Sequence, residues 1–475
     1  MAFYDLREFI ERLKKTDDII FIEEEMDWNL EIGAVIRRCN EKKGPATLFQ
    51  KIKDYTSGYR ILGGPLATYR RMAVALGLSP DASFSEMIDV YLERFRNPIK
   101  PNVVLTGPCK ENILLGDEVD LLKFPVPVIH EGDGGRYIGT WHIVAVKDLD
   151  SDWVNWGMYR LMVHDSKTMG GLMVPQQHIG MILNKYESLN RPMDIAVAIG
   201  TEPITSFIAA SYIPKGVSEV DIIGGLRKEP LEIVKCETMD LFVPAASEIV
   251  IEGQVLPNTR KDEGPFGEYG GYMAGGRGPR PVIKVNAITY RNEPILTVSN
   301  MGTPVDDSDI LTNITNSAEL KYGLREAGLP ITEVYIPPQS CSNMCVVGTK
   351  TPYSNIAKQI ASFIWSHKSG FYIPRVIVVN DDVDPTDMDQ VIFAFATKCH
   401  PERGTTVYKD MPGSPLTPFL SFQERKWFRC TNVLYDCTWP LDWKDEHIPK
   451  LASFKSIYPE EVQKNVIKKL KKYNI

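Results

Sequence analysis

The sequence predicts a multidomain α/β protein with a β-rich centre, and three observations support this fold class. The chain has 475 residues, of which 43% are hydrophobic, and a single core seldom keeps growing beyond about 250–300 residues. Helical and strand patterns alternate in the first hundred residues and return after residue 306. Between them, short apolar runs broken by Gly, Pro and Asp indicate strands. We therefore expect three parts, at residues 1–102, 103–305 and 306–475.

The N-terminal segment, residues 1–102, mixes helices and strands. Apolar residues recur three or four positions apart from Leu6 to Leu13, which predicts an amphipathic helix. The short apolar runs 19–22 and 46–49 predict two strands. Further helical patterns lie at 30–36, 70–78 and 84–95. Together these elements indicate an α/β unit that ends where prolines interrupt the pattern.

The central segment, residues 103–305, is predicted to form a β-barrel or a β-sandwich. The turn-forming residues 291–294 separate two apolar runs, so we expect a hairpin connection there. The clearest strand patterns lie at 143–146, 195–199, 248–253 and 282–290.

The C-terminal segment, residues 306–475, returns to helical patterns. The apolar run from Arg375 to Val379 is typical of a buried strand, and acidic residues and a helix from about Thr386 follow it. This order of strand, loop and helix predicts a parallel sheet. Residues 459–473 form a basic amphipathic helix, which suits an exposed face, a subunit contact or a membrane surface.

Composition narrows the class of protein. The 54 Lys and Arg against 61 Asp and Glu give a net charge of -7, which argues against a nucleic-acid partner but permits a local phosphate pocket. No apolar stretch reaches the roughly 18 residues of a membrane span, and the start of the chain lacks the pattern of a secretory signal. The eight cysteines show no disulfide framework. These features favour a cytoplasmic protein without membrane partners.

One group of candidate metal ligands lies in the central segment. Asn155 offers a carbonyl oxygen, His178 an imidazole nitrogen and Glu219 a carboxylate, and such a set suits Mn²⁺ or Mg²⁺ better than Zn²⁺. The three residues are scattered over about 65 positions. From the spacing alone, separate hydrogen-bonding residues are the alternative.

A second group combines two carboxylates with a guanidinium. Glu263 and Glu268 flank a Gly-Pro-Phe-Gly turn that fixes their relative positions. With Arg160, the set provides chemistry for a carboxylate substrate: the guanidinium binds the substrate carboxylate, and a less solvated Glu with a raised pKa supplies a proton. An acidic surface loop is the alternative for the two glutamates.

A single lysine marks a third candidate site. Lys368 lies in a short polar stretch just before the strand at 375–379. A lysine in this place suits a phosphate or a cofactor, and a solvated surface charge is the alternative.

The ordered motifs resemble the UbiD family over nearly the whole chain. Arg160 follows Asn155 by five positions and precedes a Pro-Gln-Gln-His segment that ends at His178. Later come the Glu-Gly-Pro-Phe-Gly-Glu string of residues 263–268 and Lys368. The remaining matching segments are 132–135 with Tyr137 and Thr140, 243–253, 381–385 and 396–401.

The resemblance implies a fold, a cofactor and a metal. It implies a central split β-barrel of flavin-reductase-like type, followed by a C-terminal α/β oligomerisation domain. It implies prenylated FMN, supplied by a UbiX-type flavin prenyltransferase, and a nearby K⁺. It also implies a Mn²⁺ or Mg²⁺ ion that bridges to the cofactor phosphate. The implied metal ligands are Asn155, His178 and Glu219, and the implied cofactor contacts are these three with Arg160, Gln177 and Lys368.

The resemblance also implies a reaction, the reversible decarboxylation of an aromatic or α,β-unsaturated carboxylic acid with release of CO2. Arg160 would orient the carboxylate, Glu268 would donate the proton, and Glu263 would hold Arg160. A homodimer or homohexamer is implied as well. The alternative functions are an FMN-dependent oxidoreductase and a catalytically decayed flavin-binding subunit.

The sequence leaves open which acid is the substrate: phenolic, heteroaromatic, cinnamate-like or aryl-CoA. Phenolic or other aromatic acids are our first expectation. As candidates for the substrate pocket we take Tyr269, Phe371, Trp439 and Trp443.

Overall fold

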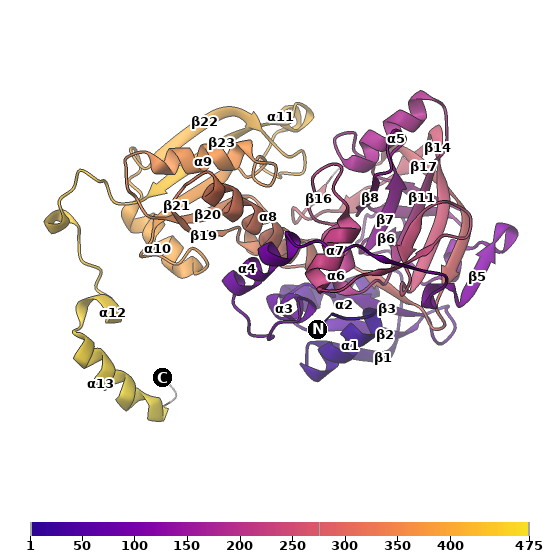
Figure 1. Cartoon of the computed structure of the whole chain (residues 1–475), viewed down its shortest axis with the longest axis horizontal. Helices are drawn as coiled ribbons and strands as arrows, with labels where there is room; N and C mark the ends of the chain where they lie inside the picture. Colours follow the sequence, from indigo (N-terminus) through magenta and orange to yellow (C-terminus); the bar gives the residue numbers. More distant parts are fainter. Residues whose placement is uncertain (1, 275, 474–475) are drawn as a thin grey trace.

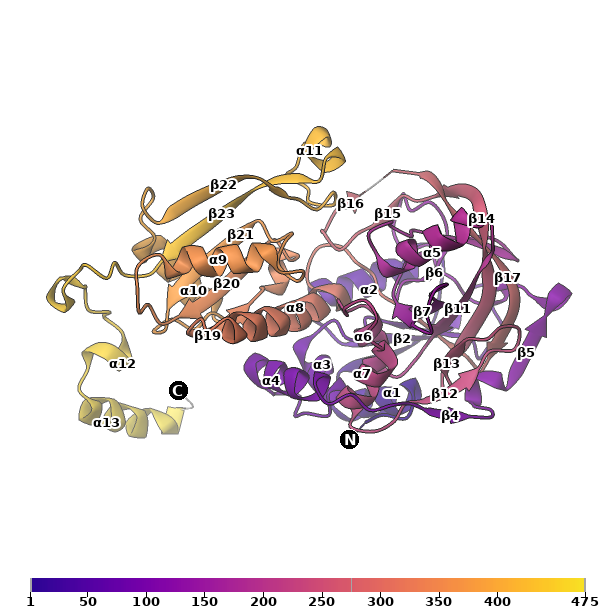
Figure 2. The ribbon, with the colours of Figure 1, turned by 45° about the horizontal axis from the view of Figure 1, so that its top comes forward.

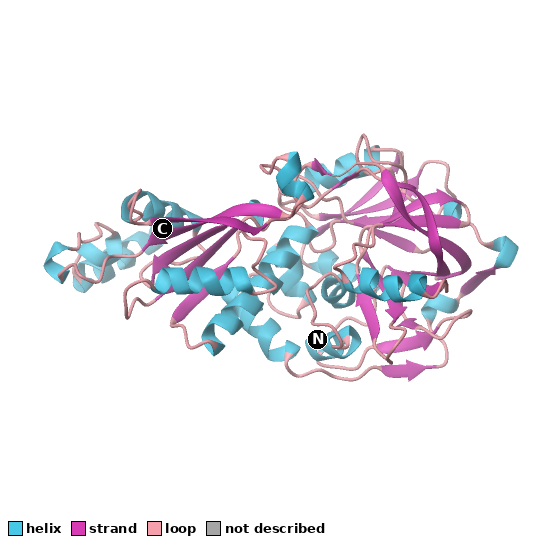
Figure 3. Cartoon of the chain, turned by 90° about the horizontal axis from the view of Figure 1, so that it is seen from above, coloured by secondary structure: helices cyan, strands magenta, loops and turns pink. Residues whose placement is uncertain are grey.

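The computed structural model of the chain describes residues 2–274 and 276–473. An N-terminal unit and a large curled sheet form one lobe, a smaller α/β unit forms the other, and a C-terminal arm leads away from the second lobe (Figure 1). Seen from above, each lobe has its own sheet and covering helices (Figure 3). The predicted mixed α/β multidomain class is therefore confirmed.

The N-terminal unit is a four-stranded sheet with the strand order β1-β2-β3-β18. Helix α1, Leu6–Lys15, buries the apolar side that the sequence predicts, and the Asp5 side chain caps it by accepting a hydrogen bond from the Glu8 amide. The other helices are α2 (Glu31–Glu41), α3 (Tyr69–Ala75) and α4 (Phe84–Phe95). The strands are β1 (Ile19–Met26), β2 (Ala46–Ile52), β3 (Arg60–Gly63) and β18 (Ile295–Val298).

The connection at 291–294 differs from its prediction. Strand β18 pairs in parallel with β3 of the N-terminal sheet, whereas β17, just before the turn, belongs to the central sheet. The expected hairpin is therefore wrong: the turn carries the chain from one sheet into another. Turn-forming residues predict that the chain changes direction, but they do not predict which strand the next strand pairs with.

The central unit is a strongly curled sheet of nine strands. Its order is β6-β9-β10-β17-β14-β11-β7-β8, and β5 pairs with β17 beside this path. The longest pair, β14 and β17, is antiparallel and joins Ile249 to Tyr290 at one end and Glu263 to Gly278 at the other. The strands are β5 (Asn112–Leu115), β6 (Tyr137–Gly139), β7 (His142–Lys147), β8 (Val154–Gly157), β9 (Leu161–Asp165), β10 (Thr168–Gly171), β11 (Met193–Ile199), β14 (Ile249–Glu263) and β17 (Gly278–Tyr290).

Both faces of this sheet are buried, which explains the nearly continuous apolar runs. On β11, Ala196 and Ala198 belong to the core shared with helices α6 and α7, while Val197 belongs to the core on the other face. The covering helices are α5 (His178–Ser188), α6 (Pro203–Ala209) and α7 (Glu219–Arg227). Short strands complete the unit: β4 (Asn102–Val104), β12 (Glu232–Lys235), β13 (Phe242–Pro244), β15 (Phe266–Gly267) and β16 (Met273–Ala274).

The C-terminal unit contains the predicted parallel sheet, with antiparallel strands at both edges. Strands β20, β21 and β23 run parallel, and β19 and β22 flank them. Helices lie on both faces of the sheet (Figure 2). The strands are β19 (Ile331–Tyr335), β20 (Met344–Thr349), β21 (Arg375–Asn380), β22 (Thr405–Pro412) and β23 (Arg429–Cys437). The helices are α8 (Asp307–Glu326), α9 (Ile356–Ser366), α10 (Met388–Lys398) and α11 (Phe422–Lys426).

The end of the chain forms an arm rather than part of the second lobe. Helices α12 (Phe454–Ile457) and α13 (Glu460–Leu470) stand clear of both lobes (Figures 1 and 2) and bury no side chain. Within the described residues, no helix has both the length and the apolar character that a membrane crossing requires.

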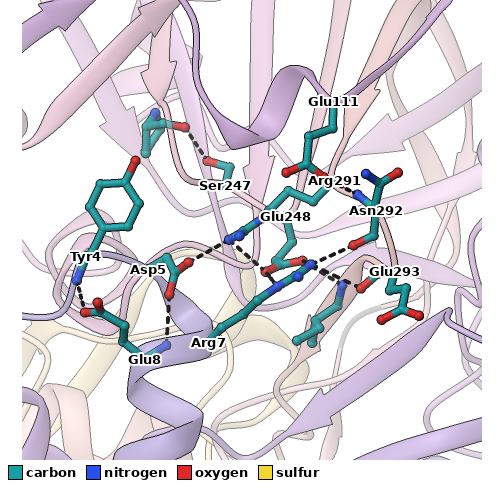
Figure 4. Close-up of polar contacts among 12 residues, drawn as sticks. Tyr4, Asp5, Arg7, Glu8, Glu111, Ser247, Glu248, Arg291, Asn292 and Glu293 are labelled. Carbon is teal, nitrogen blue, oxygen red and sulfur yellow. Dashed lines mark hydrogen bonds and ion pairs between the residues drawn. The ribbon is translucent and has the colours of Figure 1, made fainter.

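A buried ion-pair cluster fastens helix α1 to the central sheet (Figure 4). The Glu248 carboxylate, which is fully buried, accepts hydrogen bonds from Nε and Nη2 of Arg7 at 2.8 and 2.9 Å. Arg291 lies 3.4 Å from the same carboxylate and donates to Asp5 at 2.8 Å. The cluster thus joins the start of α1 to the residues that flank β14 and β17.

We expect Glu248→Ala to destabilise the protein by about 1.5–3 kcal/mol, because the change removes the buried acceptor of Arg7 and of the Ile295 amide. Calorimetry should record a lower Tm. The control is Glu460→Ala, which removes an exposed pair with Lys464 and should cost no more than about 1 kcal/mol. Equal shifts in the two variants would contradict the anchoring role of Glu248.

Candidate active site

A cavity of about 440 Å³ lies where the central sheet meets the C-terminal unit. Strand β8 and the beginning of α5 form one side, and the first turns of α8 form another. Loops of both lobes complete it. The loop segments that line the cavity are 139–142, 209–213, 268–270, 341–343, 368–373 and 414–417.

Asn155 and Glu219 meet at one end of this cavity. Asn155 on β8 donates a hydrogen bond from Nδ2 to Glu219 at 2.8 Å, and the Trp156 amide donates to the other carboxylate oxygen at 3.2 Å. Ser218 caps helix α7, so its first residue, Glu219, is held at the helix start. Tyr159 donates to the Asn155 Oδ1 atom at 2.9 Å. The two candidate ligands are therefore fixed before any ligand binds.

The chemistry of this end suits a cation. Burial raises the pKa of Glu219 to about 7, although hydrogen bonds from the backbone and Asn155 oppose the rise. A buried carboxylate in this condition gains most from a positive partner. His178, the first residue of α5, also lines the cavity, and burial, with Lys368 and Lys215, lowers its pKa to about 4. A neutral imidazole is the form that binds metal.

The candidate metal group includes only two side chains of the kinds that bind metal most often. Within residues 2–274 and 276–473, no cluster of three His, Cys, Asp or Glu side chains could hold a metal ion. For a site with three donors, Asn155 would supply the third through its amide oxygen, whose second lone pair the Tyr159 hydroxyl leaves free. An oxygen-rich set with one nitrogen fits Mn²⁺ or Mg²⁺.

The same end of the cavity offers positive charge to an anion. Lys368 lines the cavity half-buried, and its charge acts on the pKa of both Glu219 and His178, so these groups are neighbours. Gln177 is the residue just before helix α5, which begins at the cavity. Free amides at the start of a helix attract phosphate. Lys368 and α5 therefore fit a phosphate group.

Arg160 lies between the two predicted glutamates. Its Nε and Nη2 atoms each lie 2.9 Å from a different oxygen of Glu263, and its Nη1 atom hydrogen-bonds Glu268. All three side chains are at most 10% exposed. Burial raises the pKa of Glu268, Arg160 lowers it, and the negative charge of Glu263 raises it again, with a net rise. Glu268 is thus inclined to hold a proton.

The two glutamates differ in access to the cavity. Arg160 and Glu268 line it, whereas Glu263 lies behind them and is fully buried. Tyr137 donates a hydrogen bond to Glu263 at 2.7 Å, so this carboxylate receives hydrogen bonds from both Tyr137 and Arg160. Tyr137 belongs to one of the segments that resemble the family, but no role was assigned to it from the sequence. Its partner lies 126 positions away, which spacing alone does not reveal.

Polar residues of α8 also line the cavity. Ser308, Thr312 and Asn316 recur at four-residue spacing and therefore share one side of the helix. The Oδ1 atom of Asn316 is buried without a hydrogen-bond partner. These residues escaped sequence reasoning because their helix carries polar residues on several sides.

The four predicted substrate-pocket residues divide into two pairs. Tyr269 and Phe371 line the cavity as expected. Trp439 and Trp443 do not: they line a separate cavity of about 420 Å³ in the C-terminal unit, where their rings lie 5.7 Å apart. That part of the prediction is wrong, because the strand β23 before them ends away from the first cavity.

Three models of one family match the chain. Their descriptions are the N-terminal, Rift-related and C-terminal domains of the UbiD 3-octaprenyl-4-hydroxybenzoate carboxy-lyase. The matched residues are 10–91, 102–304 and 309–437 respectively.

Named relatives and solved structures agree with this family. Pyrrole-2-carboxylic acid decarboxylase of Pseudomonas aeruginosa is 33% identical over 97% of this chain and 96% of its own length. Ferulic acid decarboxylase 1 of Saccharomyces cerevisiae is 33% identical over 99% and 98%. The closed form of Sedimentibacter hydroxybenzoicus vanillic acid decarboxylase has a TM-score of 0.88 at 30% identity, over 99% of this chain and 100% of that one. An evolved dimeric form of the UbiD-class enzyme HmfF from Pelotomaculum thermopropionicum, in complex with prFMN, has a TM-score of 0.82 at 30% identity, over 94% and 97%.

Proposed function

Because the chain belongs to the UbiD family of carboxy-lyases, we propose that its cavity binds prenylated FMN and a divalent metal and that Glu268 delivers the proton that replaces CO2. The chain is a decarboxylase of aromatic or α,β-unsaturated carboxylic acids, as family and relatives indicate. The observation that carries the proposed proton transfer is the access of Glu268, and not of Glu263, to the cavity.

The residues present fit the cofactor and the metal. Asn155, His178 and Glu219 would hold Mn²⁺ or Mg²⁺, while Lys368 and Gln177 would contact the phosphate end of the cofactor. The bound metal would offset phosphate charge, so an acidic protein can retain a dianion. Prenylated FMN, when bound, supplies an electron sink for the electron pair that CO2 leaves on an sp² carbon.

Arg160 has donors left for the substrate. A guanidinium carries five N–H groups, and three of them face Glu263 and Glu268. One N–H on each terminal nitrogen is left, and these would orient the substrate carboxylate. Glu263 fixes the guanidinium plane, because it receives two parallel hydrogen bonds from Arg160 and one from Tyr137.

Glu268 is the group that moves a proton. Its burial and the charge of Glu263 favour the protonated form, and its position at the cavity wall gives it access to the substrate carbon. In the reverse direction the same carboxylate would remove the ring or vinyl proton before carboxylation. The intact set of Arg160, Glu263 and Glu268 argues against a catalytically decayed subunit.

We propose an aromatic acid with a hydrogen-bonding group on the ring as the substrate. The α8 side of the cavity presents Ser308, Thr312 and Asn316. A wholly apolar substrate would leave the buried Asn316 Oδ1 atom without a partner, at a cost of about 1–3 kcal/mol. A panel of acids with and without ring hydroxyl or N–H groups, scored by CO2 release, tests this preference.

Several finer expectations remain proposals. We propose that the chain divides into domains at residues 1–102, 103–305 and 306–475, and the three matched family domains support this division. We propose that the central domain is a split barrel of flavin-reductase-like type, and the curled sheet supports this proposal. We also propose a K⁺ ion beside the phosphate and a UbiX-type prenyltransferase as the cofactor source. All eight cysteines are free thiols, which supports a reducing cytoplasm.

Replacement of His178 tests the metal assignment. Purified His178→Ala, produced together with a flavin prenyltransferase, should contain less metal and less cofactor than wild type, because the metal would link protein and phosphate. Elemental analysis and flavin absorbance measure the two contents. His164→Ala is a matched control, since His164 does not line the cavity and should leave both unchanged. Full retention of metal and cofactor in His178→Ala would contradict the assignment of His178 as a metal ligand.

Replacement of Glu268 tests the proton donor. Glu268→Gln keeps the size of the side chain but has no acidic proton, so decarboxylation should slow by roughly 10² to 10⁴. Exchange of the product C–H hydrogen with deuterated water should fall in parallel, because it uses the same step in reverse. Cofactor content should stay normal.

The matched variant for Glu268 is Glu263→Gln. It should disturb the orientation of Arg160 and raise KM, since Glu263 holds the guanidinium. If Glu268→Gln stays within a few-fold of wild type in both assays while Glu263→Gln is inactive with normal cofactor content, the two roles must be exchanged.

We also propose that the chain is a homodimer or homohexamer. In helix α13, Val462 and Ile467 are 43% and 49% exposed on an arm that stands clear of both lobes (Figure 1), and exposed apolar side chains of this kind favour a partner. Light scattering at micromolar concentration should give at least twice the mass of one chain. A truncation before Phe454 should weaken the assembly. A monomeric full chain would contradict the proposal.

A further inference from the structure

Residues 130–135 lie beside the acid-bearing loop, but neither the metal site nor the proton transfer uses them. The Gly134 amide donates a hydrogen bond to the Pro265 carbonyl at 2.8 Å. Gly134 has no room for a side chain, because a Cβ atom there would lie 2.1 Å from the Gly264 carbonyl oxygen. The two segments are therefore packed backbone to backbone.

The Asp133 carboxylate joins the two segments. Its side chain is fully buried. One oxygen accepts a hydrogen bond from the Gly267 amide at 3.1 Å, immediately before Glu268. The other oxygen accepts from the His130 amide at 2.9 Å and lies 3.1 Å from His130 Nδ1. Both carboxylate oxygens are thus committed.

His130 fixes Asp133 in turn. Its Nε2 atom lies 2.8 Å from Asn300 Oδ1 and 2.9 Å from the Met301 carbonyl oxygen. Asn300 donates from Nδ2 to the Gly33 carbonyl at 2.7 Å, which sets the orientation of its amide. Both ring nitrogens therefore face acceptors, an arrangement that favours the doubly protonated imidazole. Burial opposes this charge, but hydrogen bonds to Asp133 and Asn300 produce a net rise in the pKa of His130.

The backbone contacts of Glu268 lie within its own loop: its amide donates to the Tyr272 carbonyl at 3.4 Å, and its carbonyl accepts from the Gly271 amide at 3.1 Å. Glu268 is preceded by Gly267 and followed closely by Gly270 and Gly271, and glycine restricts the chain least. Gly267 cannot be replaced by a stiffer residue, since a Cβ atom there would lie 2.5 Å from the His130 ring. The hydrogen bond from the Gly267 amide to Asp133 adds a contact that ties this glycine-rich loop to a neighbouring segment.

We propose that Asp133, oriented by His130, is a positioning residue that fixes the Gly267 backbone and thereby holds Glu268 against Arg160. This inference rests on the proposed role of Glu268 as proton donor. A displacement of about 1 Å in a reacting group can cost up to roughly 10² in rate, so loss of one backbone contact beside the acid is enough to slow the reaction.

The test measures kcat, KM and cofactor content for the holoenzyme of Asp133→Ala and Asp133→Asn. Asp133→Ala should lower kcat by roughly 10-fold to 10²-fold with KM and cofactor content close to wild type, because Arg160 and the metal ligands are unchanged. Asp133→Asn keeps an acceptor oxygen for the Gly267 amide but turns an N–H₂ group toward the His130 amide, so it should recover part of the lost rate. Asp148→Ala is the control: Asp148 is also buried and accepts a hydrogen bond from Ser151 at 2.8 Å, but it does not line the cavity, and kcat should persist.

A double variant separates positioning from general damage. In the Glu268→Gln background, Asp133→Ala should have almost no further effect on kcat, because residues that act through one group are not additive. An equal effect in both backgrounds, a fall in kcat no larger than that of Asp148→Ala, or an Asp133→Asn enzyme as slow as Asp133→Ala would overturn the proposal. If Glu268→Gln itself is fully active, the proposed role of Glu268 as proton donor is wrong. That outcome is distinct from one in which Glu268→Gln is slow and only the proposed role of Asp133 is wrong.

Discussion

Two buried carboxylates and one guanidinium meet at the cavity wall, and the chemistry of the protein depends on this imbalance of charge. Arg160 is bound by Glu263 through two hydrogen bonds and by Glu268 through one. One positive charge cannot balance two negative ones when all three side chains are at most 10% exposed. A proton on Glu268 removes the imbalance. We propose that the reaction uses this proton, which burial and the charge of Glu263 favour on Glu268.

The architecture maintains this arrangement from several directions. Arg160 follows β8 and precedes β9, while Glu263 ends the long strand β14. The C-terminal lobe lines the cavity through α8, and the same cavity gathers the groups that suit a metal and a phosphate. The candidate proton donor and the groups that suit a phosphate therefore line one cavity. The ion-pair cluster at Glu248 joins the N-terminal helix to the same sheet.

Sequence reasoning succeeded where local pattern or an ordered motif carried the information. The helix from Leu6 to Leu13 and the strand from Arg375 to Val379 follow from periodicity. The candidate residues Arg160, Glu263 and Glu268 meet in space because a motif keeps order and spacing. Sequence reasoning failed where strand pairing or a hydrogen bond joins segments that are distant in the chain. Strand β18 enters another sheet, and the contact of Asp133 with the Gly267 amide spans 134 positions. Neither contact leaves a periodic trace.

The location of the stored proton is the central claim, and neutron crystallography of the deuterated holoenzyme near neutral pH tests it most directly, since ordinary X-ray structures do not reveal hydrogens. The account predicts a deuteron on a carboxylate oxygen of Glu268, none on Glu263, and a fully charged Arg160 between them. A bare Glu268, or a deuteron on Glu263 instead, would contradict it.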